Sequence, residues 1–236
     1  IYVPIETMGT GRVMAVERLG EHMMYERKAQ QYSPEEIKKI IQDVEGKHRR
    51  GAETLYWEDV AVGDKVGPMV LPPWTLLDQV AWHGVNYAAS VWGSHGDDIL
   101  AFEPYYHRLR EGSLLGSLTH PMTRWPWTPN TEHEDALLAA FRGQPGPFDF
   151  GVQRSQIPQQ LITNWMGDRG FLKSLSVTLT LPNVYGDATW CQGRVTRKFR
   201  QNQECMADLE VWCDNQRGER TAQGRATVLL PLRDDG

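Results

Sequence analysis

The spacing of apolar residues predicts an amphipathic helix in the first quarter of the chain. Within SPEEIKKIIQDVEGKHRRG, four aliphatic residues recur at intervals of three or four, namely Ile37, Ile40, Ile41 and Val44. Such spacing places them on one face of a helix. Ser33 is a favourable N-cap, Pro34 suits the first helical position, and Glu36 completes a capping box. Gly46 or Gly51 is expected to end this helix, whose apolar face should pack against another element.

The next segment predicts a short strand, a proline turn and a second helix. The sequence is YWEDVAVGDKVGPMVLPPW followed by TLLDQVAWHGVNYAAS. Thr75 is the expected cap of the helix. Its apolar stripe is expected to consist of Leu77, Val80, Ala81, Val85 and Ala88. Residues 93–130 are aromatic, broken by prolines and weakly periodic, which is typical of a long functional loop.

The last third of the chain predicts a helix followed by strands. SQIPQQLITNWMGDRG is expected to form a helix with Ser155 near its cap and Gly167 or Gly170 at its end. KSLSVTLTLP alternates between apolar and polar residues, which is typical of a half-buried strand. Three further strand-like runs follow, and we expect the four to form an antiparallel meander that buries the helix. These elements predict an α+β domain.

Composition removes several classes of function. Lys and Arg number 25 against 30 Asp and Glu, and the formal charge is −5. No basic block indicates a nucleic-acid surface. No apolar run approaches the roughly 20 residues that cross a bilayer, and no signal peptide is apparent. Three cysteines without CxxC spacing favour a reducing cytoplasm over a disulfide framework or zinc cluster. No pair of histidines has the helical spacing of a familiar zinc motif, so no metal is expected.

Several motifs resemble the MaoC-like acyl dehydratases, also known as the (R)-specific enoyl-CoA hydratase family. The most specific are GVQR…LITNWMGDRGFL and the strand pair PNVYGDATWCQGRV. YWEDVAVGD and TLLDQVAW also fit, as does TEHEDALLAAFRGQPGPFDFG. In the last stretch His133, Asp135, Ala139 and Gly143 have the family's H-x-D-x-x-x-A-x-x-x-G spacing, and Gly151 follows.

The resemblance implies a hot-dog fold, in which an antiparallel sheet wraps around a central helix. It covers residues 56–236, with an insertion at about 93–130, and leaves 1–55 as an N-terminal extension with the amphipathic helix. Open sheet edges predict a homodimer or higher oligomer, or a hetero-oligomer with another hot-dog subunit.

The implied chemistry is the addition or removal of water at the double bond of an enoyl-CoA. Such a reaction needs a proton-exchanging pair, for which a histidine and a carboxylate are suited, and a donor for the developing enolate. We expect His133 as the acid/base, Asp78 as its partner, and Gly151 at a helix N-terminus as the enolate donor. Arg194, Arg197 and Lys198 are candidates for binding the phosphates of CoA. CoA is part of the substrate, and no cofactor is expected.

One departure from the family pattern leaves alternatives open. Catalytic members carry an aspartate five residues before the histidine, where this chain has Thr128. Asp78, Asp135 or Asp149 could substitute for it, and His95 in a second H-x-D motif could be the catalytic histidine instead. Two further functions therefore remain open: a non-catalytic hot-dog subunit that binds acyl-CoA or completes a partner's site, and a hot-dog thioesterase.

Each candidate residue also has a structural explanation. His133 could be a helix histidine among acids, and His95 a loop histidine. Asp78 could complement the dipole of its helix, and Gly151 could be a conformational glycine after Pro147. The three cations could belong to a solvated strand face.

Overall fold

The computed structural model describes residues 30–86, 133, 135–136, 139 and 144–233. The chain forms two compact units. The described part of the first consists of residues 30–74 and 149–233, and that of the second consists of residues 75–86, 133, 135–136, 139 and 144–148. The region 93–130, His95, Thr128 and the N-terminal residues 1–29 lie outside the described residues.

The first unit is built on a five-stranded antiparallel sheet in the order β1-β3-β4-β5-β2. The strands are β1 (Lys65–Leu71), β2 (Phe171–Leu179), β3 (Thr189–Gln201), β4 (Glu204–Asn215) and β5 (Arg220–Leu229). Asn202 and Gln203 join β3 to β4, and both have a positive φ, as in the two-residue turns that match the twist of a hairpin. The expected α+β class is therefore confirmed.

The prediction of a four-strand meander was wrong for its first strand. β3, β4 and β5 are consecutive neighbours, whereas β2 pairs with β5 on the far edge. The connection between β2 and β3 is not a hairpin turn, because the two strands are not neighbours in the sheet. Buried polar groups hold this connection in place. Asp187, for example, accepts a hydrogen bond from the amide of Val184 at 3.0 Å. The predicted half-burial of β2 is confirmed, since Leu175 and Val177 pack against the core.

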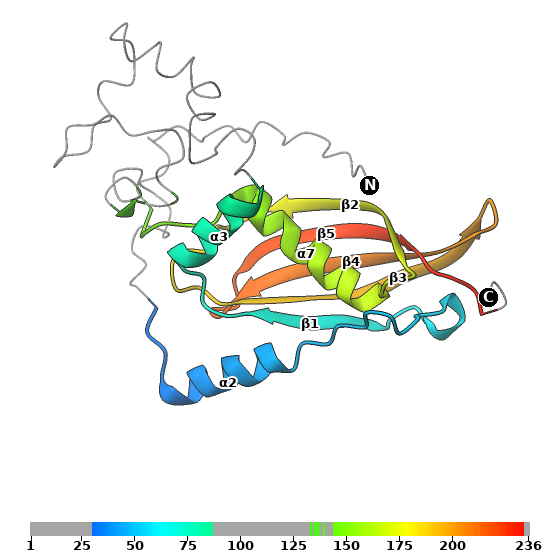
Figure 1. Ribbon diagram of the computed structural model, residues 1–236, viewed down its shortest axis with the longest axis horizontal. Coiled ribbons are helices and arrows are strands. Elements are labelled where there is room, and N and C mark those ends of the chain that lie inside the picture. Colours follow the sequence, from blue (N-terminus) through cyan, green and yellow to red (C-terminus); the bar gives the residue numbers. More distant parts are fainter. Residues whose placement is uncertain (1–29, 87–132, 134, 137–138, 140–143, 234–236) are drawn as a thin grey trace, which may run out of the picture. The chain divides into compact units, whose positions relative to one another are not determined.

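Helix α7 (Gly151–Met166) lies against one face of this sheet (Figure 1). Leu161 and Ile162 are almost fully buried and join a core that includes Val195, Leu209 and Val228. Burial of each such side chain contributes about 1.5–3 kcal/mol. The helix begins four residues earlier than Ser155, whose hydroxyl instead donates to the Val152 carbonyl within the helix. Gly167 ends the helix, as expected.

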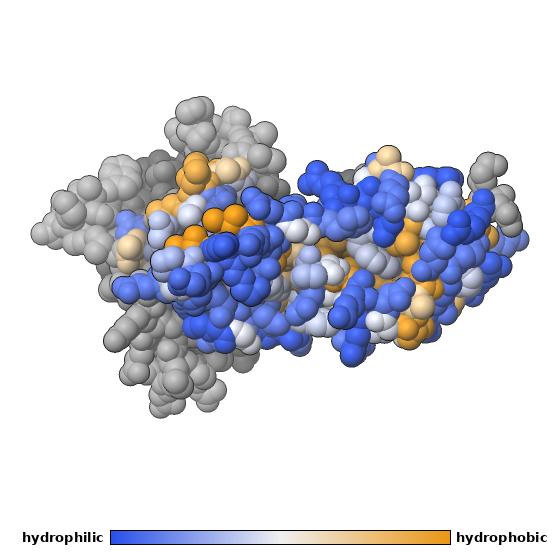
Figure 2. Space-filling model, turned by 90° about the horizontal axis from the view of Figure 1, so that it is seen from below, coloured by the Kyte–Doolittle hydropathy of each residue, from blue (hydrophilic) through white to orange (hydrophobic). Residues whose placement is uncertain are grey.

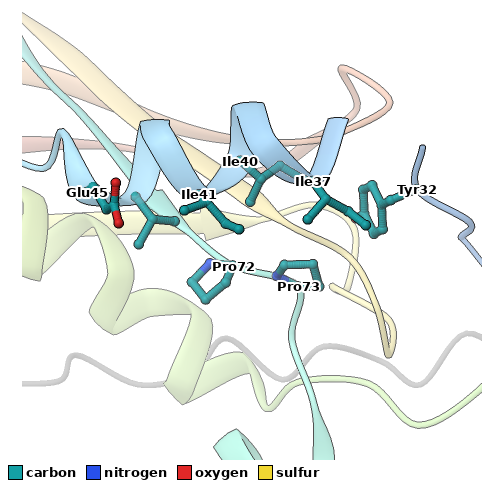
Figure 3. A pocket seen from close by; sticks show the side chains of 8 residues that line it. Tyr32, Ile37, Ile40, Ile41, Glu45, Pro72 and Pro73 are labelled. Carbon is teal, nitrogen blue, oxygen red and sulfur yellow. The ribbon is translucent and has the colours of Figure 1, made fainter. Parts of the chain in front are cut away.

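Helix α2 (Pro34–Glu45) has the predicted capping box, in which Ser33 and Glu36 exchange hydrogen bonds of 3.2 and 2.7 Å. It contacts β1. Of its aliphatic stripe only Ile40 is buried, whereas Ile37 and Ile41 are about half exposed. Figure 3 shows these side chains directed toward Pro72 and Pro73 across a hollow of about 280 Å³. On the side of the molecule seen in Figure 2, the surface is mostly hydrophilic with smaller hydrophobic areas.

In the second unit, α3 (Leu76–Asn86) follows Thr75 as predicted. Where the structure describes the expected apolar stripe, it is not the buried face, and the side chains of Val85 and Ala88 lie outside the described part. Leu77 is 76% exposed and Val80 62% exposed, whereas Gln79 is fully buried. Apolar spacing located the helix correctly but assigned the wrong side to the interior, because tertiary packing decides which face is covered.

The three cysteines are free and buried. Cys191 and Cys213 face each other on β3 and β4. Hydrogen bonding with the Cys213 thiol, followed by burial, raises the pKa of Cys191 well above its ordinary value. A buried thiol of raised pKa is a poor nucleophile, because the thiolate is the reactive form. Among the described residues, no helix is long and apolar enough to cross a membrane.

Candidate active site

His133 is buried and has a fixed ring orientation. Its Nδ1 lies 2.7 Å from the carbonyl oxygen of Phe148, and its ring meets the Phe148 ring with centroids 4.3 Å apart. A carbonyl oxygen can only accept, so Nδ1 carries the hydrogen. In the neutral form of the imidazole, Nε2 is then the nitrogen with the lone pair. A fixed tautomer of this kind is what a general base requires.

Gly151 is the first residue of α7, in agreement with the start of the central helix that the resemblance implies. The N-cap residue Phe150 provides no side-chain cap. Amides in the first turn of a helix have no intrahelical acceptor and lie at the positive end of the helix dipole. A methyl group added at Gly151 would lie 2.9 Å from Cδ1 of Leu179, so the helix start also packs closely against β2.

Asp78 takes part in the cap of α3. Its Oδ2 accepts from the amide of Thr75 at 2.8 Å and from the Thr75 hydroxyl at 2.7 Å. The Thr75 hydroxyl lies 3.4 Å from the Asp78 amide. These bonds form the reciprocal pattern of a capping box, which accounts for both residues structurally. Any role of Asp78 in proton exchange stays a prediction.

The cations proposed for CoA binding interact with their own sheet. Arg194 pairs with Glu210 at 2.8 Å and Arg197 with Asp208 at 2.9 Å. The ammonium of Lys198 lies 4.0 Å from the centroid of the Trp57 ring. Lys198 is also nine residues along β3 from Thr189. At ~3.3 Å per residue this is roughly 30 Å from the end of β3 that adjoins the start of α7. Phosphate binding by these residues stays a prediction.

A buried polar cluster adjoins the start of α7, and Asp149 is at its centre. The carboxylate is 1% exposed. It accepts from Nε of Arg154 at 3.0 and 3.1 Å, from Nη2 of Arg154 at 2.9 Å, and from the amide and side chain of Asn183 at 3.0 and 2.8 Å. Burial raises the pKa of the Asp149 carboxyl above its ordinary value, while the guanidinium of Arg154 and the Asn183 donors oppose that rise.

This cluster was not predicted from the sequence as a unit. Asp149 was considered only as a substitute proton carrier, and both of its oxygens are engaged by Arg154 and Asn183, which argues against that role. Removing one partner from a buried ion pair typically costs about 3–5 kcal/mol. The signal in the sequence was the PN of PNVYGD, since Asn183 supplies two of the donors.

The site residues fall into the two units. Gly151, the buried cluster and the three cations belong to the first, and His133 and Asp78 to the second. Within the described residues, no group of three or more His, Cys, Asp or Glu side chains could hold a metal ion.

The first unit, in which α7 lies against one face of a five-stranded antiparallel sheet, has the arrangement of a hot-dog fold. No family model matches the chain, and no curated protein matches it. Among solved structures it resembles R-hydratase PhaJ1 from Pseudomonas aeruginosa, with a TM-score of 0.51 and 15% identity over 76% of this chain and 88% of that one. This similarity shows the hot-dog fold.

Two further solved structures are also similar. One is the (R)-hydratase from A. caviae involved in PHA biosynthesis, with a TM-score of 0.46 and 19% identity over 74% of this chain and 99% of that one. The other is the MaoC-like dehydratase from Rhodospirillum rubrum, with a TM-score of 0.45 and 16% identity over 76% and 98%.

Proposed function

We propose that this protein is an acyl-CoA hydratase or dehydratase, which adds or removes water at the α,β double bond of an enoyl thioester. The observation that carries the proposal is the start of α7 at Gly151, a glycine at a helix N-terminus without a side-chain cap, in a hot-dog fold. A helix start of this kind offers backbone donors to an oxygen that gains negative charge. The orientation of His133 by the Phe148 carbonyl supports the same proposal.

In the proposed reaction, Nε2 of His133 takes a proton from water as the water oxygen bonds to the β-carbon. The electrons of the double bond move toward the thioester, and the enolate oxygen accepts a hydrogen bond from the Gly151 amide. The α-carbon then receives the proton that His133 took from water, passed on through Asp78, which completes the addition and returns His133 to its neutral form. Asp78 is the proposed carboxylate partner. Its cap bonds use Oδ2, so Oδ1 is the oxygen that would exchange the proton.

The direct test is to incubate the protein with trans-2-enoyl-CoA substrates and follow the ultraviolet absorbance of the conjugated thioester. A thiol reagent in parallel samples reports hydrolysis. Loss of absorbance without release of thiol is the expected result. Release of thiol would instead identify a hot-dog thioesterase, and the hydratase proposal would then be abandoned.

A non-catalytic hot-dog subunit is the second candidate, because two observations favour it. Thr128 stands where catalytic members carry aspartate, and the carboxylate of Asp78 already caps α3. Binding of acyl-CoA by a folded protein that turns over no enoyl-CoA would support this alternative. The outer strands β1 and β2 carry open backbone edges within the described sheet, and they support the proposal of a dimer or of pairing with another hot-dog chain.

Substitution of Gly151 by alanine tests its proposed role. We expect kcat/KM to fall by about 100-fold, because the added methyl group displaces the acyl group from the amide. The same methyl group would also meet Leu179 at 2.9 Å. The control is therefore the double variant Gly151→Ala/Leu179→Ala, in which that contact is removed.

Comparison of the single and double variants, with Leu179→Ala as the reference, distinguishes a packing role of Gly151 from a catalytic role. If Gly151 is needed only because Leu179 is near, the double variant regains the activity of the Leu179→Ala variant. If the acyl group must approach the helix start, activity stays low in the double variant. Recovery of activity would contradict the role of Gly151 as the enolate donor.

A further inference from the structure

We call the buried cluster of Asp149, Arg154 and Asn183 the α7 clamp. Its polar side-chain groups are hydrogen-bonded to one another and to neighbouring protein groups. Both carboxylate oxygens of Asp149 are engaged, and the third guanidinium nitrogen of Arg154 donates to the Leu181 carbonyl at 2.6 Å. The side-chain oxygen of Asn183 accepts from the Thr189 hydroxyl at 3.3 Å. These bonds occupy the groups that would otherwise recognise a ligand. The α7 clamp can therefore contribute through geometry but not by touching a substrate.

The α7 clamp holds the chain on both sides of Gly151. Two residues before it, the Asp149 amide donates to the Asn183 carbonyl at 3.0 Å. Three residues after it, Arg154 is joined to Asp149 by its side chain and to the Phe150 carbonyl by its amide at 2.9 Å. Asn183 and Leu181 belong to the connection that leads into β3. The first turn of α7 is therefore tied to the sheet by directional bonds.

Stability alone does not account for an ion pair in this place. Apolar side chains of similar volume often replace a buried ion pair without loss of stability. What they lack is direction, because the planar guanidinium fixes both the distance and the angle of a carboxylate. The feature that distinguishes the α7 clamp from an apolar contact is therefore the orientation that it gives to the helix start.

We propose that the α7 clamp is a positioning device that places the Gly151 amide where it donates a hydrogen bond to the thioester oxygen of an enoyl-CoA. This inference rests on the proposed function. A displacement of about 1 Å at a reacting group can cost about 100-fold in rate. Loss of the clamp should therefore lower kcat, whereas substrate affinity, which depends on the rest of the acyl-CoA, should change little.

The test is the double variant Asp149→Leu/Arg154→Met, which leaves no buried charge without a partner. The two buried Asn183 donors lose their acceptor, so we expect a modest fall in its midpoint of chemical denaturation with the protein still folded. Its kcat for a trans-2-enoyl-CoA should fall by about 100-fold, and its KM should change little. Should this variant fail to fold, Arg154→Lys keeps the charge but loses the planar fork, and the same fall in kcat is expected.

The matched control is the double variant Asp214→Leu/Arg220→Met, which removes a more exposed pair of the same chemistry at 2.5 Å between β4 and β5. Its kcat should equal that of the wild type. The inference is overturned if the clamp variant keeps the kcat of the wild type. It is equally overturned if kcat and the denaturation midpoint fall together in both double variants, since that result reports general loss of structure.

A second readout separates this inference from the proposed function. The amide exchange and NMR resonance of Gly151 can be compared in the wild type and the clamp variant without any substrate. Faster exchange and a shifted resonance at Gly151, with β3 and β4 unchanged, are expected even if the wild type hydrates no enoyl-CoA. An unchanged Gly151 amide would overturn the positioning role, whatever the enzyme assay shows.

Discussion

Replacing Gly193 by alanine is expected to lower the free energy of unfolding by about 3 kcal/mol. Gly193 lies in β3 between Val66 of β1 and Val211 of β4. A methyl group there would lie 2.5 Å from the backbone oxygen of Glu210 and 2.8 Å from Cγ1 of Val211. The oxygen belongs to the sheet, so it cannot move without weakening the pairing of β3 and β4. Chemical denaturation of the two proteins measures the difference.

Gly46→Ala is the matched control for this substitution. Gly46 has an ordinary helical φ of −71° at the C-cap of α2, and its nearest neighbour to an added methyl group is the Gln42 carbonyl at 3.3 Å. The free energy of unfolding of the Gly46→Ala variant should differ from that of the wild type by less than about 1 kcal/mol. If Gly193→Ala is no more destabilising than Gly46→Ala, the sheet accommodates the added methyl group despite the short distances at Gly193. The packing explanation would then be wrong.

The motif PNVYGDATWCQGRV, which includes Gly193, indicates the fold through residues that make structural contacts. Asn183 binds Asp149, Asp187 pairs with Arg217 at 2.6 Å, and Trp190 donates from its ring nitrogen to Asp43 at 3.1 Å. Each of these residues is therefore explained by a structural contact. A motif of this kind implies the arrangement of strands and helix.

The elements that could be predicted are those determined by neighbours in sequence. The cap of α2 depends on Ser33 and Glu36, three residues apart, and it was predicted correctly. The pairing of β2 with β5 was not, because Leu175 meets Ala226 across a long interval of sequence. Alternation gives the two faces of a strand but not the identity of its partner. The exposed face of α3 was missed for the same reason.

Similar limits apply to the candidate site. The family resemblance placed Gly151 at the start of α7, whereas the sequence pattern alone placed that start near Ser155. The contact between His133 and the Phe148 carbonyl spans fifteen residues, and no periodicity indicates it. Asp78 illustrates the opposite difficulty, because the threonine and aspartate three residues apart that fit the family pattern also form a capping box.

Replacing His133 by alanine is expected to lower kcat/KM for a trans-2-enoyl-CoA by about 10²–10⁴-fold, the usual range for loss of a general acid or base. The loss corresponds to about 3–5 kcal/mol of transition-state stabilisation. His133 is buried, so part of any loss could come from unfolding. His133→Asn addresses this, because an asparagine side chain can still donate to the Phe148 carbonyl but cannot exchange protons near neutral pH.

Two further histidine variants complete the comparison. His48→Ala changes an exposed histidine outside the candidate site, and it should leave kcat/KM unchanged. His95→Ala tests the second H-x-D motif. If His133→Asn is folded and inactive while His95→Ala is active, His133 is the acid/base. If His95→Ala alone abolishes turnover, the catalytic histidine lies in the region 93–130, and the orientation of His133 by Phe148 is structural. Added imidazole should partly restore His133→Ala in the first case only, since the small base replaces the missing proton acceptor rather than the missing contact.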